Sequence, residues 1–545
     1  MADLDFILVT QSNVLDYDGY GRLPLDRIDL YKSLVYPRMV YHEGGFRSHL
    51  DYLNHQRHGK FFDDADYAER RQMLNIWNLP SMSGVHLLNY LSQFGFRVRV
   101  INNLDSEWDW FAEAYANNKR PPLVGISSTF YLSWKEVGHV AKRLRGLDPE
   151  MDIVLGGAYA NAETIHARVA EFEPRMRRYG IRYVLHAFNS EVDLRSLIQA
   201  RRDGSDLSAV QNLAWIDGDL KRGAFNAGSK GWNNPLLALT DIPPTWHQHD
   251  MPFLNRTIQI RTASGCPFAC AFCSYPTTAG GWSTVQADHV RAHLDSVRKI
   301  GNVDRIIFID DTFNVPPHRF RDLIRMFAEY PFEWFCFLRV QYVNEEDVKM
   351  MKESGCAGVY LGIESASDKV LKNMNKRVTS RQFAEGVRLL NKYDIPYLAA
   401  FVLGFPGEDD ATIQENVDFI RNNGVRFYSL KEFYYMEHTK VHDQREQYGL
   451  TGTGGKWSHN TMTHEDAARI KLELFQSITD STHIDPDTSL WYMAYLYDQG
   501  YSFKDIEHMQ AGINDLMKRQ LETSAAAASA WPGARPQGAA LDAAE

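Results

Sequence analysis

The stretch SGCPFACAFCSYP, residues 264–276, contains three of the five cysteines in this chain of 545 residues. Cys266, Cys270 and Cys273 form the pattern C-x3-C-x2-C directly after an apolar, strand-like segment. Thiolates favour iron–sulfur clusters, zinc or Cu(I). A [4Fe–4S] cluster usually takes four thiolates, so three would leave one iron open to another ligand. The alternative is a zinc site, with another cysteine or a histidine as its fourth ligand.

Strands alternating with helices surround this stretch. The series begins at RTIQIRTASGCP, and helical patterns such as PHRFRDLIRMFAEY separate its members. The later strands are predicted at 305–313, 333–340, 358–367, 396–408 and 426–437. This spacing is typical of a βα barrel, whose reactive groups gather at the carboxyl ends of the strands. The sequence therefore predicts a partial (βα)6 barrel.

A second alternating series lies upstream. Its apolar strands are predicted at 5–12, 98–104, 121–130, 151–161 and 183–191. Such a series predicts a doubly wound, Rossmann-like parallel sheet, which binds ligands at the carboxyl ends of its strands. Those ends carry small and polar residues suited to a large ligand, although serine and glycine also commonly end strands in loops. The candidate residues are Ser127, Ser128, Thr129, Gly156, Gly157, Ala158 and Asn189.

The chain is thus expected to be an α/β protein of several domains. The predicted divisions are a Rossmann-like domain at 1–200 with an insertion at about 13–78, a linker at 201–255, the barrel at 256–444, a mostly helical region at 445–522 and a disordered tail at 523–545.

Composition narrows the class of partner. The formal net charge is -10, so we expect no basic surface for nucleic acid or for an anionic membrane. No apolar run approaches the ~20 residues that a membrane span needs. The N-terminus does not resemble a signal peptide, and the cysteines do not form a secreted disulfide framework. We therefore expect a cytoplasmic protein.

The motif CPFACAFC at the first strand of a βα barrel resembles the radical S-adenosylmethionine (SAM) superfamily. The resemblance implies that Cys266, Cys270 and Cys273 bind a [4Fe–4S] cluster whose unique iron is chelated by SAM. It also implies an electron donor such as flavodoxin or ferredoxin. Phe272 matches the aromatic residue that packs near the adenine in this family, and Tyr275 is expected beside it.

Two further motifs of the family follow in order. IDDTF ends the second strand, where the family contacts the methionyl amino group of SAM. The commoner form there is Gly-Gly-Glu, so Asp310 and Asp311 depart from it in a way seen in the cobalamin-type branch. The resemblance implies that Arg339, at the end of the third strand, pairs with the SAM carboxylate.

The next two strands also end in motifs of this family. LGIESAS resembles the fourth-strand motif and places Glu364 and Ser365 near SAM. VLGFPGE resembles the glycine-rich motif that flanks the adenine, at Gly404, Pro406 and Glu408. A carboxylate at the end of one strand is more often a solvated loop residue or a helix cap. The order of the motifs behind three cysteines makes the resemblance specific.

The upstream sheet resembles the cobalamin-binding domain found in one branch of this superfamily. LPSMSGVHLLNYLSQFGF is similar to that branch's first helix with its Pro-x-x-x-Gly, and VLGGAYAN to its Gly-Gly strand end. The resemblance implies cobalamin at the carboxyl edge of this sheet. The signature Asp-x-His-x-x-Gly is absent from the first 195 residues, so we expect no histidine ligand to cobalt.

The resemblance implies a cobalamin-dependent radical SAM methyltransferase that modifies a carbon of a small-molecule or peptide natural product. The alternatives are a ring contraction, cyclisation or oxidative rearrangement, a methyl transfer without a radical, and a non-catalytic sensor. A tRNA methylthiotransferase is excluded because no cysteine precedes Cys266.

Substrate contacts are expected at the end of the sixth strand. Tyr435 and Glu437 are the candidate catalytic residues there, with Tyr434 and His438 beside them. Their alternative role is ordinary packing at the barrel rim. The aromatic-rich C-terminal region is expected to act as a lid.

Overall fold

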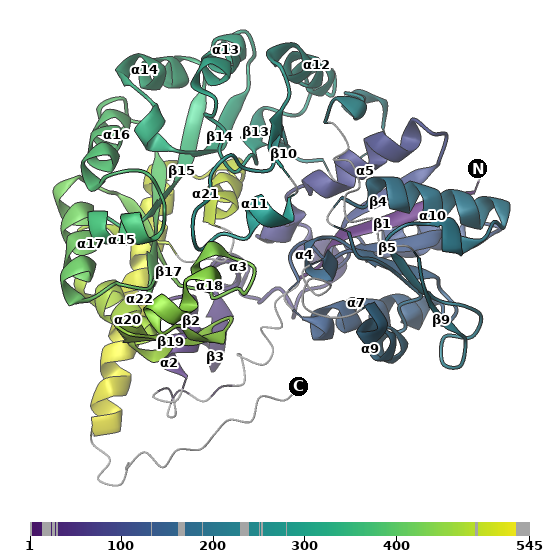
Figure 1. Ribbon diagram of the computed structural model, residues 1–545, viewed down its shortest axis with the longest axis horizontal. Helices are drawn as coiled ribbons and strands as arrows, with labels where there is room; N and C mark the ends of the chain where they lie inside the picture. Colours follow the sequence, from purple (N-terminus) through teal and green to yellow (C-terminus); the bar gives the residue numbers. More distant parts are fainter. Residues whose placement is uncertain are drawn as a thin grey trace.

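Two seven-stranded sheets form the framework of the molecule and lie side by side (Figure 1). The N-terminal part of the chain forms the first sheet, and the central part forms the second. This computed structural model describes residues 3–13, 23, 25, 28, 31–131, 133–161, 169–187, 189–228, 239–249, 251, 254–279, 281–484 and 489–529. No helix among these residues is both long and apolar enough to span a bilayer.

The first sheet has five parallel strands and two antiparallel ones at one edge. In spatial order the strands are β4 (Val98–Asn103), β1 (Phe6–Gln11), β5 (Leu123–Ser127), β6 (Ile153–Gly156), β7 (Tyr183–Leu185), β8 (Leu213–Ile216) and β9 (Phe225–Ala227). The order reverses between β1 and β5, and open α/β sheets bind ligands beyond the carboxyl ends at such a point.

Both faces of the first sheet are covered, which explains why the strands are almost continuously apolar. On one face, Ile7 and Val9 of β1 pack with α7 (Trp134–Leu147) and α9 (Phe172–Tyr179). On the other face, Phe6 and Leu8 pack with α5 (Met82–Ser92) and α10 (Glu191–Asp203). The doubly wound arrangement predicted from the sequence is confirmed.

The segment 201–255 is not simply a linker, so the prediction for its first part is wrong. Leu213–Ile216 is a fully buried strand that pairs antiparallel with β7, and β9 pairs with it in turn. The hairpin supplies hydrogen-bond partners to what would otherwise be an open edge of the sheet.

The second sheet is entirely parallel, as predicted for the partial barrel. Its strands, in spatial order, are β10 (Thr257–Ile260), β13 (Arg305–Phe308), β14 (Glu333–Leu338), β15 (Cys356–Glu364), β16 (Tyr397–Leu403), β17 (Phe427–Glu432) and β21 (Thr482–His483). The first six follow chain order and β21 adds a short seventh. Helices α12 (Ala287–Arg298), α13 (Pro317–Phe327), α14 (Glu345–Glu353), α16 (Ser380–Lys392) and α17 (Asp410–Asn422) cover the outer face.

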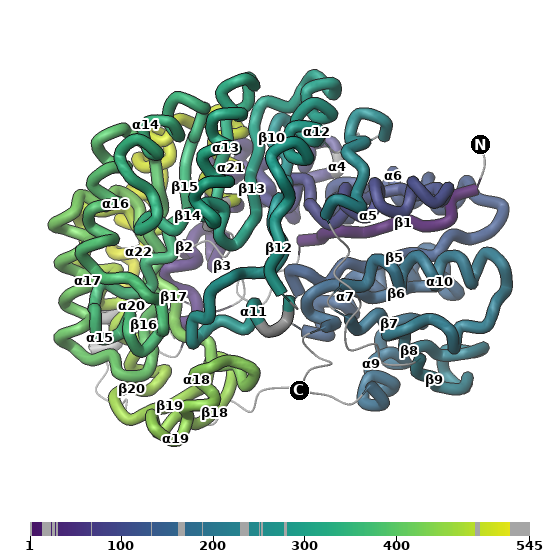
Figure 2. The backbone as a smooth tube through the Cα atoms, turned by 45° about the horizontal axis from the view of Figure 1, so that its top comes forward, coloured from purple at the N-terminus to yellow at the C-terminus, as the bar shows by residue number. Residues whose placement is uncertain are grey.

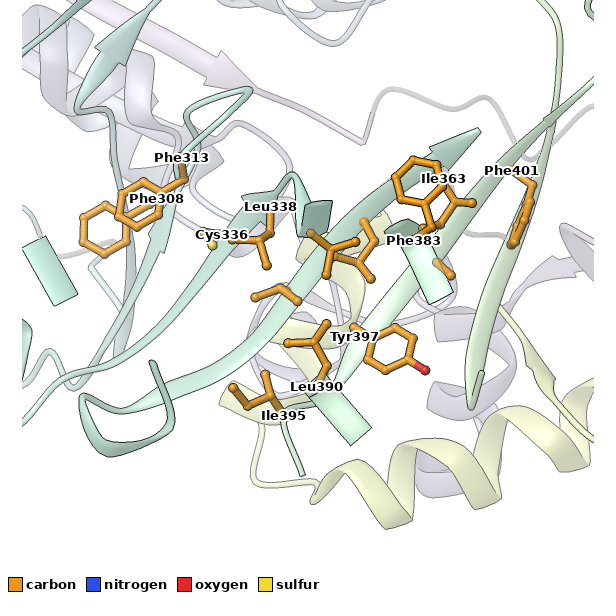
Figure 3. Packing of buried hydrophobic residues seen from close by; sticks show 14 of the residues in the cluster. Phe308, Phe313, Cys336, Leu338, Ile363, Phe383, Leu390, Ile395, Tyr397 and Phe401 are labelled. Carbon is orange, nitrogen blue, oxygen red and sulfur yellow. The ribbon is translucent and has the colours of Figure 1, made fainter. Parts of the chain in front are cut away.

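The main hydrophobic core lies between these strands and helices. Figure 3 shows part of it, including Phe308, Ile363 and Phe401 from the strands and Phe383 and Leu390 from α16. Side chains alternate between the two faces of a strand, so their neighbours in sequence point to the inner face.

The inner face is covered by the C-terminal helices α21 (Ser489–Asp498) and α22 (Phe503–Ser529). Ile307 and Phe335 pack with Ala494 of α21, while Leu398 and Phe427 join a cluster that includes residues of α21 and α22. Leu398 and Phe427 lie at the beginnings of their strands, opposite the carboxyl ends. These helices therefore do not form the lid that the sequence suggests.

The early insertion packs mainly against the barrel and its C-terminal helices, while its end at Trp77 also contacts the first sheet. Its hairpin, β2 (Met39–His42) and β3 (Gly45–Ser48), lies beside α22 in Figures 1 and 2. The amide of Gln520 on α22 contacts both Tyr36 and Tyr41, accepting from the Tyr36 hydroxyl at 3.0 Å. The insertion thus joins the two halves of the chain.

The end of the chain is helical further than expected. Helix α22 extends to Ser529, into the segment predicted as a disordered tail, and the rest of that segment lies outside the described residues.

Candidate active site

The three clustered cysteines lie on the loop that follows β10 and the short strand β11 (Ala263–Ser264), at the carboxyl end of the barrel. Each sulfur accepts a hydrogen bond from a described residue. Backbone N–H groups of Phe268 and Tyr275 donate to Cys266 and Cys273, respectively. The guanidinium of Arg339 donates to Cys270 Sγ at 3.2 Å. Such donors stabilise the negative charge of bound thiolates and tune an iron–sulfur cluster.

Two other segments, at Met374–Asn375 and at Val441, hold the cysteine loop in place. The Ala271 N–H donates to the Met374 carbonyl at 2.8 Å, and the Ala271 carbonyl accepts from the Val441 N–H at 2.9 Å. The side-chain amide of Asn375 donates to the Ala269 carbonyl at 2.7 Å. The loop is therefore shaped before any cofactor binds.

The donor set fits an iron–sulfur cluster better than zinc. Burial raises the pKa of Cys266, and that of Cys273 to about 11, so these thiols are protonated until a metal displaces the proton. In the described part of the chain, no three His, Cys, Asp or Glu side chains converge to hold a single metal ion. A cluster does not need such convergence, because each thiolate binds a different iron.

The remaining cysteines are part of the hydrophobic core and cannot supply a fourth ligand. Cys336 is completely buried in β14, where Figure 3 shows it near Leu338. Cys356 is 4% exposed at the start of β15, far along the strand from its carboxyl end. Two of the fourth ligands considered for zinc are thus ruled out.

Arg339 lies where the sequence predicts, at the end of β14. Asn314 fixes its backbone, accepting from its N–H at 3.0 Å and donating to its carbonyl at 2.8 Å. The guanidinium carbon lies 3.6 Å from the centre of the Phe268 ring, which stacks in turn on Tyr342. Arg339 Nη1 is buried without a hydrogen-bond partner among the described residues, so this nitrogen can serve a carboxylate ligand.

The two adjacent aspartates have different environments. Asp310 is 1% exposed and accepts from the backbone N–H groups of Thr262 and Ala263, at 2.6 and 2.9 Å, and from the Thr262 hydroxyl. These contacts shape the turn before the cysteine loop, and a contact between Asp310 and SAM stays a prediction. Asp311 is exposed at the barrel mouth and bonds to the Tyr275 hydroxyl. Desolvation raises the pKa of Asp311 to about 6. The positive charge of Arg261 opposes this shift, and repulsion from Asp310 adds to it.

The fourth-strand motif also separates into two roles. Glu364 is only partly buried and its carboxylate accepts from Lys376 Nζ at 2.8 Å. Ser365 is fully buried, and its hydroxyl lies 3.4 Å from Asn416 Oδ1, which also accepts from the Ala366 N–H at 2.6 Å. Ser365 thus supports the strand end, and only Glu364 remains available to a ligand.

The glycine-rich end of β16 is a buried turn. Gly404 has φ +89, and a Cβ there would lie 2.4 Å from the Trp457 ring. Its N–H donates to Glu408 at 2.5 Å and its carbonyl contacts His459 Nε2 at 2.9 Å. Burial raises the pKa of Glu408 to about 8. The carbonyl of Pro406 accepts from Asn373 at 3.1 Å, so this motif provides backbone shape rather than charged ligand contacts.

The predicted substrate contacts after β17 lie in different surroundings. Tyr435 is 3% exposed and its hydroxyl is 2.7 Å from His442 Nδ1, so it packs in the rim. Tyr434 is 62% exposed, and Glu437 is also exposed. His438 is half-buried beside them. The Val441–Ala271 contact shows that the segment covering the cysteine loop is the one that follows Tyr435.

At the first sheet, the ends of β5 and β6 meet closely. Ser128 donates from both N–H and hydroxyl to the Gly156 carbonyl, each at 2.7 Å, while Ser127 and Thr129 bond to each other at 3.1 Å. Gly157 has φ +103, and a Cβ there would lie 2.9 Å from the Ser128 nitrogen. Glycine at this position is thus what lets the two strand ends pack so closely.

The rest of this edge has other polar groups. Ala158 begins the helix after β6, Asn189 is half-buried after β7, and Phe188 lies outside the described residues. A cavity of about 1350 Å³ reaches Ser12, Asn13 and Trp77 beside the end of β1.

The two candidate sites face each other across the junction of the sheets. Helix α11 (Tyr275–Thr278), directly after the third cysteine, lies between the barrel and the first sheet in Figures 1 and 2. Arg261, at the end of β10, interacts electrostatically with Asp311 in the barrel and with Glu191 at the start of α10. Glu191 bonds to His86 of α5 at 3.1 Å.

Sequence reasoning missed several residues that build the site. Lys376 is the most important, because it pairs with Glu364 from a loop twelve positions later and no pattern in the sequence marks it. Three other residues were missed because they act through contacts with distant residues. Thr262 donates to Asp310, Phe268 lies against the Arg339 guanidinium, and Asn416 accepts from the Ala366 N–H. Only Phe268, inside the cysteine motif itself, could have been found from its position.

Comparison with known proteins agrees with this geometry. Residues 260–420 match the family model described as the radical SAM superfamily. An uncharacterized methyltransferase of Pyrococcus horikoshii is 27% identical over 318 residues, which cover 56% of this chain and 65% of that protein. The bacteriochlorophyllide d C-12(1)-methyltransferase of Chlorobaculum tepidum is 29% identical over 219 residues, covering 38% of this chain and 48% of that protein. The chain thus spans less than two thirds of each of these relatives.

A solved structure shares the whole architecture. It is the radical SAM methyltransferase TsrM from Kitasatospora setae, determined with cobalamin and a [4Fe–4S] cluster bound. The TM-score is 0.57 at 14% identity, and the alignment covers 96% of this chain and all of that one. At this identity the likeness concerns the fold.

Proposed function

Since residues 260–420 match the radical SAM superfamily, we propose that the chain is a member of its cobalamin-binding branch and a cobalamin-dependent radical SAM methyltransferase. The observation that carries the proposal is the cysteine loop. Three sulfurs, each with a hydrogen-bond donor, lie at the mouth of a barrel that faces the ligand edge of a Rossmann-like sheet.

Each cofactor has a corresponding place among the chain's residues. Cys266, Cys270 and Cys273 would hold the [4Fe–4S] cluster. Arg339 and Glu364 would bind SAM, with the free Arg339 Nη1 suited to its carboxylate. The edge at Ser127–Thr129 and Gly156–Ala158, where the side chains are small and Ala158 is exposed, would hold cobalamin.

When bound, these groups supply an electron that cleaves SAM and a methyl group carried on cobalt. The protein contributes position and exclusion of water. Phe268 and Tyr342 shield Arg339, so its interaction with an anion is stronger than it would be in water. The loop contacts from Met374, Asn375 and Val441 keep the sulfurs fixed during turnover.

The substrate is proposed to be a small molecule or peptide rather than a nucleic acid. The net charge of -10 opposes binding to a phosphate backbone. Exposed Tyr434 and Glu437 lie where the segment after β17 covers the barrel mouth, and we propose them as substrate contacts. We further propose a flavodoxin- or ferredoxin-like electron donor and a cytoplasmic location, where the five free cysteines stay reduced.

A test is anaerobic reconstitution with iron, sulfide and cobalamin, followed by mass spectrometry of the products formed from SAM and candidate substrates. The expected result is equal amounts of 5′-deoxyadenosine and S-adenosylhomocysteine with a methylated product. S-adenosylhomocysteine without 5′-deoxyadenosine would indicate methyl transfer without a radical. If no S-adenosylhomocysteine forms, the methyltransferase proposal is wrong and a rearrangement takes its place. Cys270→Ala should stop cleavage, while Cys356→Ala, in the core, serves as the matched control.

A further inference from the structure

Lys376 is a buried cation at the barrel mouth. It is 5% exposed and lies in the short connection between α15 (Asp368–Asn373) and α16. Its Nζ is 2.8 Å from Glu364 Oε1 and 5.8 Å from the centre of the Phe272 ring. Lys376 therefore contacts one residue of the fourth-strand motif and one residue of the cysteine loop.

The backbone around this pair has an uncommon conformation. Asn375 and Arg377, on either side of Lys376, have φ +51 and +57, and Glu364 itself has φ +63. Residues with a Cβ rarely adopt these angles, and where they do the surroundings hold them in place. Here the Asn375 amide and the Met374 carbonyl bond to the cysteine loop at Ala269 and Ala271.

The Glu364–Lys376 pair lies over a glycine. A Cβ on Gly362 would lie 2.5 Å from Glu364 Oε1 and 3.3 Å from Lys376 Nζ. The strand has a register shift between Gly362 and Glu364, which turns the Glu364 side chain back along its own strand. The glycine leaves room for the pair.

Lys376 retains hydrogen-bonding capacity. An ammonium has three N–H donors. In the part of the chain that the structure describes, Glu364 is the only residue that accepts a hydrogen bond from it. Leaving donors of a buried charge unused is costly, so a ligand with acceptor oxygens is expected beside them.

We propose that Lys376 binds SAM and positions Glu364 for it, donating to oxygen atoms of the ligand. The proposal rests on the proposed function, because it assumes that SAM binds at this mouth. Since the same short segment is bonded to the cysteine loop, it ties the SAM site to the cluster.

The test compares Lys376→Met with a matched control, Lys369→Met, which removes an exposed ion pair with Asp409. Both reconstituted proteins are assayed for iron and sulfide, for SAM affinity by equilibrium dialysis, and for the change in the electron paramagnetic resonance spectrum of the reduced cluster when SAM is added. For Lys376→Met we expect unchanged iron, a dissociation constant for SAM raised about tenfold or more, and a loss of the spectral change. Lys369→Met should match the wild type.

Two further variants separate binding from folding. Lys376→Arg keeps the charge and should recover part of the affinity. Gly362→Ala keeps every charge but displaces the pair, and should weaken SAM binding in the same direction. Unchanged SAM affinity in Lys376→Met would overturn the inference, whatever Gly362→Ala shows. Loss of the cluster in Lys376→Met would also overturn it, because the residue would then be structural.

Failure of this inference can be distinguished from failure of the proposed function. If the wild-type protein, with its cluster assembled, binds no SAM, then the proposed function fails. If the wild type binds SAM and Lys376→Met binds it equally well, only the role of Lys376 is wrong.

Discussion

The carboxyl edges of the two sheets are built in contrasting ways. At the barrel edge, charged and sulfur-containing side chains converge, as the Arg339–Cys270 and Lys376–Glu364 contacts show. At the edge of the first sheet, the side chains are small and bond mainly to each other and to the backbone, as Ser128 does with Gly156. One edge offers specific chemical groups and the other offers an open surface.

This contrast indicates how each edge can be damaged. A site made of side chains is lost when a functional group is removed, even if the substitute is small. A site made of exposed backbone is lost when bulk is added, while removal of a hydroxyl has little effect. Removal of the cysteines and addition of bulk at Gly157 should separate these two cases, with larger effects than substitution of the buried groups His293 and Glu408.

Replacing Cys266, Cys270 and Cys273 together with Ala should abolish cluster assembly and SAM cleavage while leaving cobalamin bound. The reason is that thiolates alone hold the iron, and the first sheet does not depend on them. Iron content, the visible absorption spectrum and 5′-deoxyadenosine formation provide the measurement. The double variant Cys336→Ala/Cys356→Ala, in the barrel core, is the control. Persistent SAM cleavage in the triple variant would show that the cluster is held elsewhere.

Gly157→Val should weaken cobalamin binding and leave the cluster intact. The new Cβ would lie 2.9 Å from the Ser128 nitrogen, at a φ of +103 that valine disfavours. We expect a loss of about 1–3 kcal/mol in the free energy of unfolding as well. Cobalamin retained after desalting is measured by absorbance, and Gly146→Ala, with open space around its Cβ, is the control. Normal retention in Gly157→Val would contradict a backbone-lined site.

His293, on α12 beside the connecting segment at Trp246, should make the stability of the protein sensitive to acid. The Trp246 indole donates to His293 Nδ1 at 3.0 Å, and His293 Nε2 lies 3.1 Å from His289 Nε2. Burial, with repulsion from His289 and His86, lowers the pKa of His293 to about 3. The unfolded chain, with an ordinary histidine pKa near ~6.5, then binds more protons, so stability falls as pH decreases below that value.

The measurement is urea unfolding at pH 7 and pH 5 for the wild type and His293→Gln, which keeps an acceptor for Trp246. The loss of stability between these pH values should be about 1–2 kcal/mol smaller in the variant. An identical loss in both proteins would mean that His293 does not contribute to the pH dependence.

Glu408→Gln should have the smallest effect. With a pKa of about 8, the buried carboxyl is mainly protonated at pH 7, and glutamine has nearly the same shape. Because the folded state holds this proton more tightly than the unfolded chain, wild-type stability should fall as pH rises from the ordinary pKa of 4.5 to about 8, and the variant should not show this fall. At pH 4, where the carboxyl is mainly protonated in both states, the two should differ by less than about 1 kcal/mol in thermal unfolding. A loss of stability in the variant that grows toward pH 7 would indicate an ionised Glu408.

The sequence was sufficient for the elements whose signals are local. The spacing of Cys266, Cys270 and Cys273, the alternation of strands and helices, and the place of Arg339 at a strand end all depend on neighbours within a few residues. It was insufficient where distant segments meet. The hairpin β8–β9, the docking of the insertion on α22, and Lys376 beside Glu364 depend on contacts that no local pattern encodes.

Asp310 and Asp311 show which properties of the site follow from the sequence and which depend on the tertiary structure. Their adjacent positions at the end of a strand were apparent from the sequence, as was the ligand chemistry of the cysteines, because both follow from chain order and residue type. Only the tertiary structure decided that Thr262 and Ala263 donate hydrogen bonds to the Asp310 carboxylate, while Asp311 is exposed at the barrel mouth. In the turn after a strand, adjacent side chains leave the backbone in different directions, so the two carboxylates enter different environments, and the packing around each one determines which can reach a ligand.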